Sequence, residues 1–83
     1  MSFSVSEQGT SIVITMPGRF DNNSHGEFRS VLASLRGRQQ PVVADFQHTA
    51  YMDSSALGML LCLRQDVGRY AAEMTLRNCG DGV

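Results

Sequence analysis

Residues 41–63 read PVVADFQHTAYMDSSALGMLLCL and place an apolar run, a polar loop and a second apolar run side by side. Pro41 opens VVADF, a nearly continuous apolar segment typical of a strand that is covered on both faces. Residues 55–69 then show helical periodicity, and their apolar surface is too wide for a solvent-exposed helix. Ser54 is the expected N-cap of that helix. The stretch therefore predicts a buried strand, a loop and a largely buried helix.

The residues on either side of this stretch predict three more strands and one more helix. Residues 3–5 and 12–16 alternate with the period of two that is typical of strands, and Gln8-Gly9-Thr10 is the expected hairpin turn between them. Asp21–Ser24 offers several N-caps for a helix whose apolar residues fall on one face. Those apolar residues are Phe28, Val31, Leu32 and Leu35. Residues 73–77 alternate again and predict a fourth strand.

The expected order of elements is strand, strand, helix, strand, helix, strand. It contains two strand–helix–strand units, and right-handed crossovers make the two strands of each unit parallel. The sequence therefore predicts an α/β fold with a mixed sheet of about four strands packed with helices. Loops at the carboxyl ends of parallel strands collect at one edge of a sheet, where ligands and partners usually bind. Residues 18–24 and 48–55 both fall at that edge.

Length and charge exclude several classes of function. The chain has 83 residues and a net charge of −1, which predicts a single domain over residues 1–83. All seven basic residues are Arg and they are scattered, so we expect no binding to nucleic acid or to an anionic membrane. No apolar run is long enough for membrane insertion, and residues 1–9 carry no secretory signal. The expected location is therefore the cytoplasm.

We expect no metal, no cofactor and no disulfide. Cys62 and Cys79 lack the spacing of a metal site or a redox motif, and we interpret them as small buried residues in a reducing compartment. His25 and His48 have no companion ligands at metal spacing, so we interpret them as surface or cap residues.

Two segments of the chain resemble the STAS domains, and among them the bacterial anti-sigma factor antagonists. MPGRFDNNSHGEFR is similar to the family's strand-Gly-x-(Leu/Phe)-Asp-helix segment. VVADFQHTAYMDSSALG is similar to its strand-loop-Asp-Ser-(Ser/Thr)-Gly-Leu-Gly segment, and the spacing between the two segments also fits. The resemblance covers roughly Ser11 to Cys79. One departure is Ala56, which stands where the family usually has Gly and raises the helix propensity.

The resemblance implies a function in partner switching and transcription regulation. In the family, the first Ser of the Asp-Ser-Ser motif is phosphorylated by a kinase that is itself the anti-sigma factor, and a phosphatase reverses the change. That residue is Ser54 here, with Ser55 as the alternative. The unphosphorylated protein is then expected to bind the anti-sigma factor. The implied partner-binding residues are Asp21, Asn22, Met52, Asp53, Ser54, Ser55 and Leu57.

The residues alone leave plainer interpretations open. In these interpretations Ser54 is no more than an N-cap, and Asp53 no more than a charge that complements the helix dipole. Asp21 is then only a cap for the first helix, which follows it. Gly58, inside the second helix, suggests close packing against a strand. We expect Leu60, Leu61 and Leu63 to belong to the core.

Three classes of function follow from these interpretations. A phosphorylation-switched interaction module is the first, and a non-switching STAS subunit of a bacterial lipid-transport complex is the alternative. A serine hydrolase is the third, but the sequence has no GxSxG segment and only two histidines that could act as the base. We therefore expect no enzyme activity and no catalytic residue.

The C-terminal end of the sequence gives one further expectation. STAS domains normally continue past the fourth strand with at least one more helix, whereas this sequence stops at Val83. Strand surface left uncovered on the far face of the sheet would favour association. We therefore expect either a homodimer or a piece of a longer protein.

Overall fold

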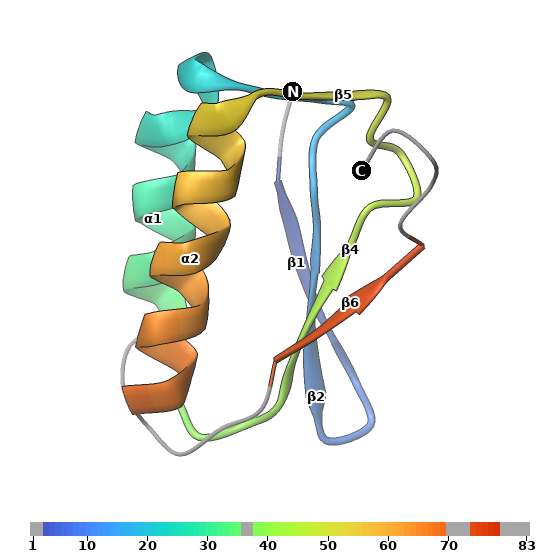
Figure 1. Cartoon of the computed structure of the whole chain (residues 1–83). Helices are drawn as coiled ribbons and strands as arrows, with labels where there is room; N and C mark the ends of the chain where they lie inside the picture. The colour runs from blue at the N-terminus through green and yellow to red at the C-terminus, as the bar shows by residue number, and fades with distance from the viewer. Residues whose placement is uncertain (1–2, 36–37, 70–73, 79–83) are drawn as a thin grey trace.

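A mixed sheet with two helices on one face forms the part of the chain that the computed structural model describes, residues 3–35, 38–69 and 74–78 (Figure 1). The sheet has the order β1-β2-β4-β6. Its strands are β1 (Ser4–Gln8), β2 (Ser11–Thr15), β4 (Val42–Asp45) and β6 (Met74–Arg77). β1 is antiparallel to β2, and the β2–β4 and β4–β6 pairs are parallel. The predicted α/β fold with a four-stranded mixed sheet is confirmed.

The remaining elements connect these strands. A 3-10 turn, η1 (Asn22–Ser24), leads into α1 (His25–Leu35), and α2 (Ser54–Arg69) follows the loop after β4. Two very short strands, β3 (Arg19–Phe20) and β5 (Tyr51–Met52), pair in parallel beside the main sheet. This second pair was not predicted, because two residues are too few to show a periodicity.

The core lies between the helices and the facing side of β2 and β4. Alternate residues of these strands point toward the helices, as the period of two requires. α1 supplies the buried residues that its sequence predicted, except that Leu32 is only partly buried. The main core residues are Ile12, Ile14, Met16, Phe20, Phe28, Val31, Val42, Ala44, Phe46, Met59 and Leu63. None of the helices in the described residues is long and apolar enough to cross a membrane.

The far face of the sheet differs from the prediction. Both helices lie on the same side in Figure 1, so no described helix covers the other side of β4. Val43 is partly buried there, whereas Asp45 on the same face and Val13 of the adjoining β2 are 1% and 2% exposed. The neighbouring positions on β1, Ser4, Ser6 and Gln8, are polar and exposed. Three of the four β4 residues are buried, so the prediction of a strand with little exposure on either face is confirmed, and this far face does not offer the exposed apolar strand surface that we expected.

A buried carboxylate ties the carboxyl ends of β4 and β6 together. Asp45 is 1% exposed, and its Oδ2 accepts a hydrogen bond from Arg77 at 2.8 Å. Its Oδ1 accepts hydrogen bonds from the Asn78 side chain at 2.8 Å and from the Gln47 backbone N–H at 3.0 Å. Burial is the largest single influence on the pKa of Asp45, and by itself it would raise that pKa. The hydrogen bonds and the charge of Arg77 together outweigh burial and lower the pKa below its usual value.

The lowered pKa of Asp45 predicts a loss of stability in acid. A group whose pKa is lower in the folded state stabilises the fold above its unfolded pKa of about 3.9, and that contribution is lost as the pH falls through the folded pKa. We expect Asp45→Asn to lower the free energy of unfolding by about 1–3 kcal/mol at neutral pH. The difference from the parent should shrink below about pH 4. Urea unfolding across this pH range measures both effects.

The matched control is Glu7→Gln. Glu7 pairs with Arg38 at 3.6 Å, but both side chains are largely exposed, so this ion pair should contribute less than about 1 kcal/mol. An Asp45→Asn difference that is no larger than that of Glu7→Gln, or that stays constant with pH, would contradict the stabilising role of the buried carboxylate.

Candidate partner-binding site

The β3–β5 pair brings the two predicted loops together at one edge of the sheet. Arg19 pairs with Tyr51 and Phe20 pairs with Met52, so Asp21 and Asp53 are the next residues along two adjacent parallel strands. The Gly18 carbonyl accepts hydrogen bonds from Ala50 at 2.8 Å and Tyr51 at 3.3 Å. The structure therefore brings residues 18–24 and 48–55 together at this edge, as the sequence predicted.

Gly18 allows the two loops to approach each other closely. A Cβ at this position would lie 3.3 Å from the backbone carbonyl oxygen of His48, which is tighter than ordinary contact. The Thr49 hydroxyl also donates to the Pro17 carbonyl at 2.9 Å. These contacts hold the two loops at a fixed separation.

Asp21 is buried and has intramolecular partners for both carboxylate oxygens. Oδ1 accepts a hydrogen bond from the Asn23 N–H at 3.0 Å, and Oδ2 accepts one from Arg19 Nε at 2.7 Å. The Asp21 N–H in turn donates to Ser24 Oγ at 3.4 Å, which completes a capping box. The cap role of Asp21 is confirmed. The role of Asp21 in partner binding stays a prediction. Both oxygens of its carboxylate already accept hydrogen bonds from within the chain.

Asp53, and not Ser54, is the N-cap of α2. The helix begins at Ser54, and Asp53 Oδ1 accepts a hydrogen bond from the Ala56 N–H at 3.1 Å. The prediction of Ser54 as the N-cap is wrong by one residue. Both residue types are good N-caps, and the direction in which β5 enters the helix decides between them.

Because Asp53 takes the cap, the hydroxyl of Ser54 is left available. Ser54 is exposed at the first helical position, and its side chain has no hydrogen-bond partner among the described residues. Ser55, the alternative, is partly buried. Of the other predicted partner-binding residues, Asn22 and Leu57 are exposed, whereas Met52 is partly buried against the core.

Sequence reasoning missed Arg19 and Tyr51. The Arg19 guanidinium lies 4.3 Å from the centre of the Tyr51 ring while its Nε holds Asp21, so one side chain links β3 with β5. Both residues are exposed beside the two loops. The sequence carries no signal for this contact, because it depends on the pairing of two strands that have no periodicity.

Several residues of α2 are more exposed than predicted. Leu63 is in the core, and Leu60 is partly buried against it, but Leu61 is exposed. Cys62 is an exposed free thiol and not a buried residue, whereas Cys79 lies outside the described residues. Gly58 has no atom within 4 Å of a Cβ position, so the predicted close packing against a strand is wrong. The helix has a broad exposed flank, and its apolar arc extends beyond what the sheet covers.

Metal binding has no support from the described residues. They contain no group of three or more His, Cys, Asp or Glu side chains placed to hold an ion. His25 and His48 are both exposed, in agreement with their interpretation as surface or cap residues.

Comparison with known proteins establishes the family. A sequence model of the STAS domain matches residues 2–83. The chain belongs to the STAS domain family. This STAS domain is 38% identical over 78 residues to the STAS-domain containing protein PA14_20770 of Pseudomonas aeruginosa (strain UCBPP-PA14). The match spans 94% of the present chain and 77% of that protein.

Solved structures extend the comparison to three dimensions. This STAS domain superposes on the anti-sigma factor antagonist SpoIIAA in its unphosphorylated form with a TM-score of 0.77 and 19% identity, over 95% of the present chain and 74% of SpoIIAA. The Bacillus protein in its phosphorylated form also gives a TM-score of 0.77 at 19% identity, over 96% and 75% of the two chains. At this identity the likeness establishes the fold, including the mixed sheet and the placement of two helices.

Proposed function

We propose that this STAS domain is an anti-sigma factor antagonist whose binding surface is switched by phosphorylation of Ser54. The observation that carries the proposal is the state of Ser54. Its hydroxyl is exposed at the first position of α2 and has no hydrogen-bond partner among the described residues, while Asp53 performs the capping. A kinase can therefore reach the hydroxyl without first breaking a contact that holds the helix.

The fold is expected to tolerate the phosphate. Phosphorylation adds a charge of about −1.5 to −2 at neutral pH. A negative group at a helix N-terminus is stabilised by the helix dipole and by backbone N–H groups that have no partner within the helix. The match to both forms of SpoIIAA is in keeping with a fold that changes little on modification.

The same phosphate would oppose binding of a partner at this edge. A protein that packs over Ser54 and Leu57 has to remove water from the dianion. The carboxylates of Asp21 and Asp53 lie nearby, on the residues that directly follow β3 and β5. The partner that this proposal requires is an anti-sigma factor with serine kinase activity in the bacterial cytoplasm. A cognate phosphatase would restore the unmodified surface.

Phosphopeptide mapping by mass spectrometry tests the modification directly. We expect the protein isolated from its own cells to carry phosphate on Ser54, because Ser54 is exposed and Ser55 is partly buried. Phosphate found on Ser55 alone would place the acceptor one residue later. If neither serine is ever modified, the protein is better explained as a non-switching STAS subunit of a lipid-transport complex.

A further inference from the structure

Arg19 and Tyr51 form an exposed pair on the outer side of β3 and β5. The two residues are directly opposite each other in the register of these strands, so their side chains leave the same face. The next residue, Phe20, points the other way and is fully buried. The Arg19 side chain is 70% exposed, and Tyr51 is 44% exposed. The pair therefore presents a cation and an aromatic ring to solvent beside the candidate site.

Two contacts hold the Arg19 guanidinium in one position. Its Nε donates to Asp21 Oδ2 at 2.7 Å, and its central carbon lies 4.3 Å from the centre of the Tyr51 ring. The carboxylate thus holds one edge of the planar group while the ring covers one of its faces. An arginine that is already held in place loses less conformational freedom on binding than a mobile one.

The far end of the same guanidinium has unused donors. Neither terminal nitrogen, Nη1 or Nη2, has a hydrogen-bond partner among the described residues. Their N–H groups lie side by side in the plane of the guanidinium, a geometry that matches the two oxygens of one carboxylate. Burial of a charged group without a partner costs free energy, so a protein that covers Arg19 has to supply an acceptor.

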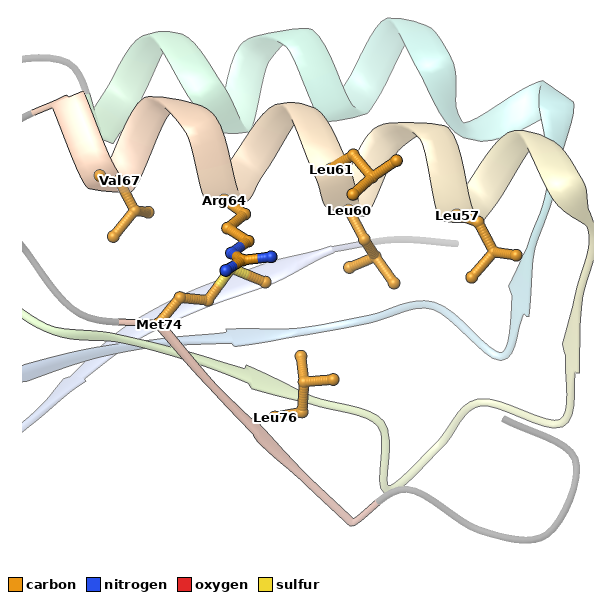
Figure 2. A pocket seen from close by; sticks show the side chains of 8 residues that line it. Leu57, Leu60, Leu61, Arg64, Val67, Met74 and Leu76 are labelled. Carbon is orange, nitrogen blue, oxygen red and sulfur yellow. The ribbon is translucent and has the colours of Figure 1, made fainter.

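Arg19 and Tyr51 lie on the same edge of the molecule as Ser54. Tyr51 is three residues before Ser54, about 10 Å along an extended chain. Leu57 lies one turn further along α2 and is 58% exposed, and Figure 2 shows it nearest the start of the helix among the labelled side chains. A protein interface of ordinary size is wide enough to cover all four residues at once.

We propose that Arg19 recognises a carboxylate of the partner and that Tyr51 positions the guanidinium for this contact. The inference rests on the proposed function and adds the chemistry of the partner: an Asp or Glu side chain of the anti-sigma factor accepts hydrogen bonds from Nη1 and Nη2 of Arg19. Arginine and tyrosine are among the residues that contribute most to binding at protein interfaces. A phosphate on Ser54 then also repels the carboxylate that the partner brings to Arg19.

Titration with a purified partner tests the role of Arg19. The probe is the protein that the parent retains from a lysate of the source cells. Arg19→Glu should weaken its binding at least about tenfold, because two carboxylates would then face each other. Arg19→Lys keeps the charge without the planar pair of donors, so its affinity should lie between those of Arg19→Glu and the parent.

The matched control is Arg38→Glu, which reverses the charge of another exposed arginine. Arg38 pairs with Glu7 of β1 at the opposite end of the sheet from β3 and β5 (Figure 1). This control should bind the partner as the parent does. Urea unfolding of each variant shows whether the fold is retained, and the neutral Arg19→Gln replaces Arg19→Glu if the latter is unfolded.

Double-mutant cycles separate a direct contact from a structural role of Arg19. Each Asp and Glu of the partner is replaced in turn by Asn or Gln and titrated against the parent and against Arg19→Gln. One partner carboxylate should be coupled to Arg19 by at least about fivefold in affinity. Tyr51→Leu, which removes the ring, should weaken binding, whereas Tyr51→Phe, which keeps the ring, should not.

The outcomes distinguish this inference from the proposed switch. Equal binding by Arg19→Glu and Arg38→Glu, or the absence of any partner carboxylate coupled to Arg19, overturns the carboxylate contact even when Ser54→Glu still loses the partner. Tyr51→Leu with the affinity of the parent overturns the positioning role of Tyr51. If Ser54→Glu binds as the parent does while Arg19 remains coupled to a carboxylate, the switch is wrong and the contact stands. A parent that retains no protein overturns both.

Discussion

Ser54→Glu should lose its partner while keeping its stability. The introduced carboxylate lies at the first position of α2, where the helix dipole favours a negative charge by about 0.3–1 kcal/mol, so unfolding in urea should be unchanged or slightly harder. A partner docked over Ser54 would have to bury that charge. We expect binding to weaken by about 2 kcal/mol or more, which is at least about thirtyfold. Capture of proteins from a lysate of the source cells, with each variant as bait, identifies the partner, and titration then gives its affinity.

Ser54→Ala and Asp53→Ala are the matched controls, and they separate capping from binding. Ser54→Ala removes a hydroxyl without a hydrogen-bond partner among the described residues, so the change in stability should stay within about 0.5 kcal/mol and the partner should be retained. Asp53→Ala removes the hydrogen bond to the Ala56 N–H and should cost about 1 kcal/mol. If Ser54→Glu and Ser54→Ala capture the same proteins with equal affinity, the switch hypothesis is wrong and a static STAS subunit replaces it.

Asp53 caps α2 and Ser54 is exposed, and the sequence alone predicts only part of this arrangement. The sequence places both residues at the start of a helix, because a polar run precedes an apolar periodic one. It does not decide which of them is the N-cap, since both types cap well and the choice depends on the backbone direction leaving β5. That direction is fixed by the pairing of β5 with β3, a contact between residues more than thirty positions apart along the chain.

The exposed flank of α2 shows a second limit. Periodicity places Leu61 and Leu63 in the same apolar helix, and their residue type gives no difference between them. The structure buries Leu63 completely and leaves Leu61 exposed, because the strands of the described residues cover only part of the apolar arc. A sequence pattern gives the width of an apolar surface, whereas its neighbours in three dimensions decide how much of it is covered.

Phe20→Ala should be the most destabilising substitution near the site. Phe20 belongs to β3, a strand of only two residues, yet its side chain is fully buried. Its ring packs edge-on against Phe3 with 5.5 Å between ring centres, and its backbone pairs with Met52 of β5. Truncation of a buried Phe to Ala typically costs about 3–5 kcal/mol. For a chain of this size, the melting temperature should fall by more than about 10 °C, as measured by circular dichroism.

The matched control for Phe20→Ala is Val5→Ala on β1. Val5 is 42% exposed, so its truncation removes apolar contact without leaving an enclosed cavity and should cost less than about 1 kcal/mol. Phe20 also affects the candidate site, because it immediately precedes Asp21. The buried ring holds β3 against β5, and β3 in turn places the capping box of η1 beside Asp53. Phe20→Ala should therefore also weaken capture of the partner below the melting temperature, whereas Val5→Ala should not. Equal stability losses for the two variants would show that β3 is not anchored by the core, and the placement of Asp21 would then need another cause.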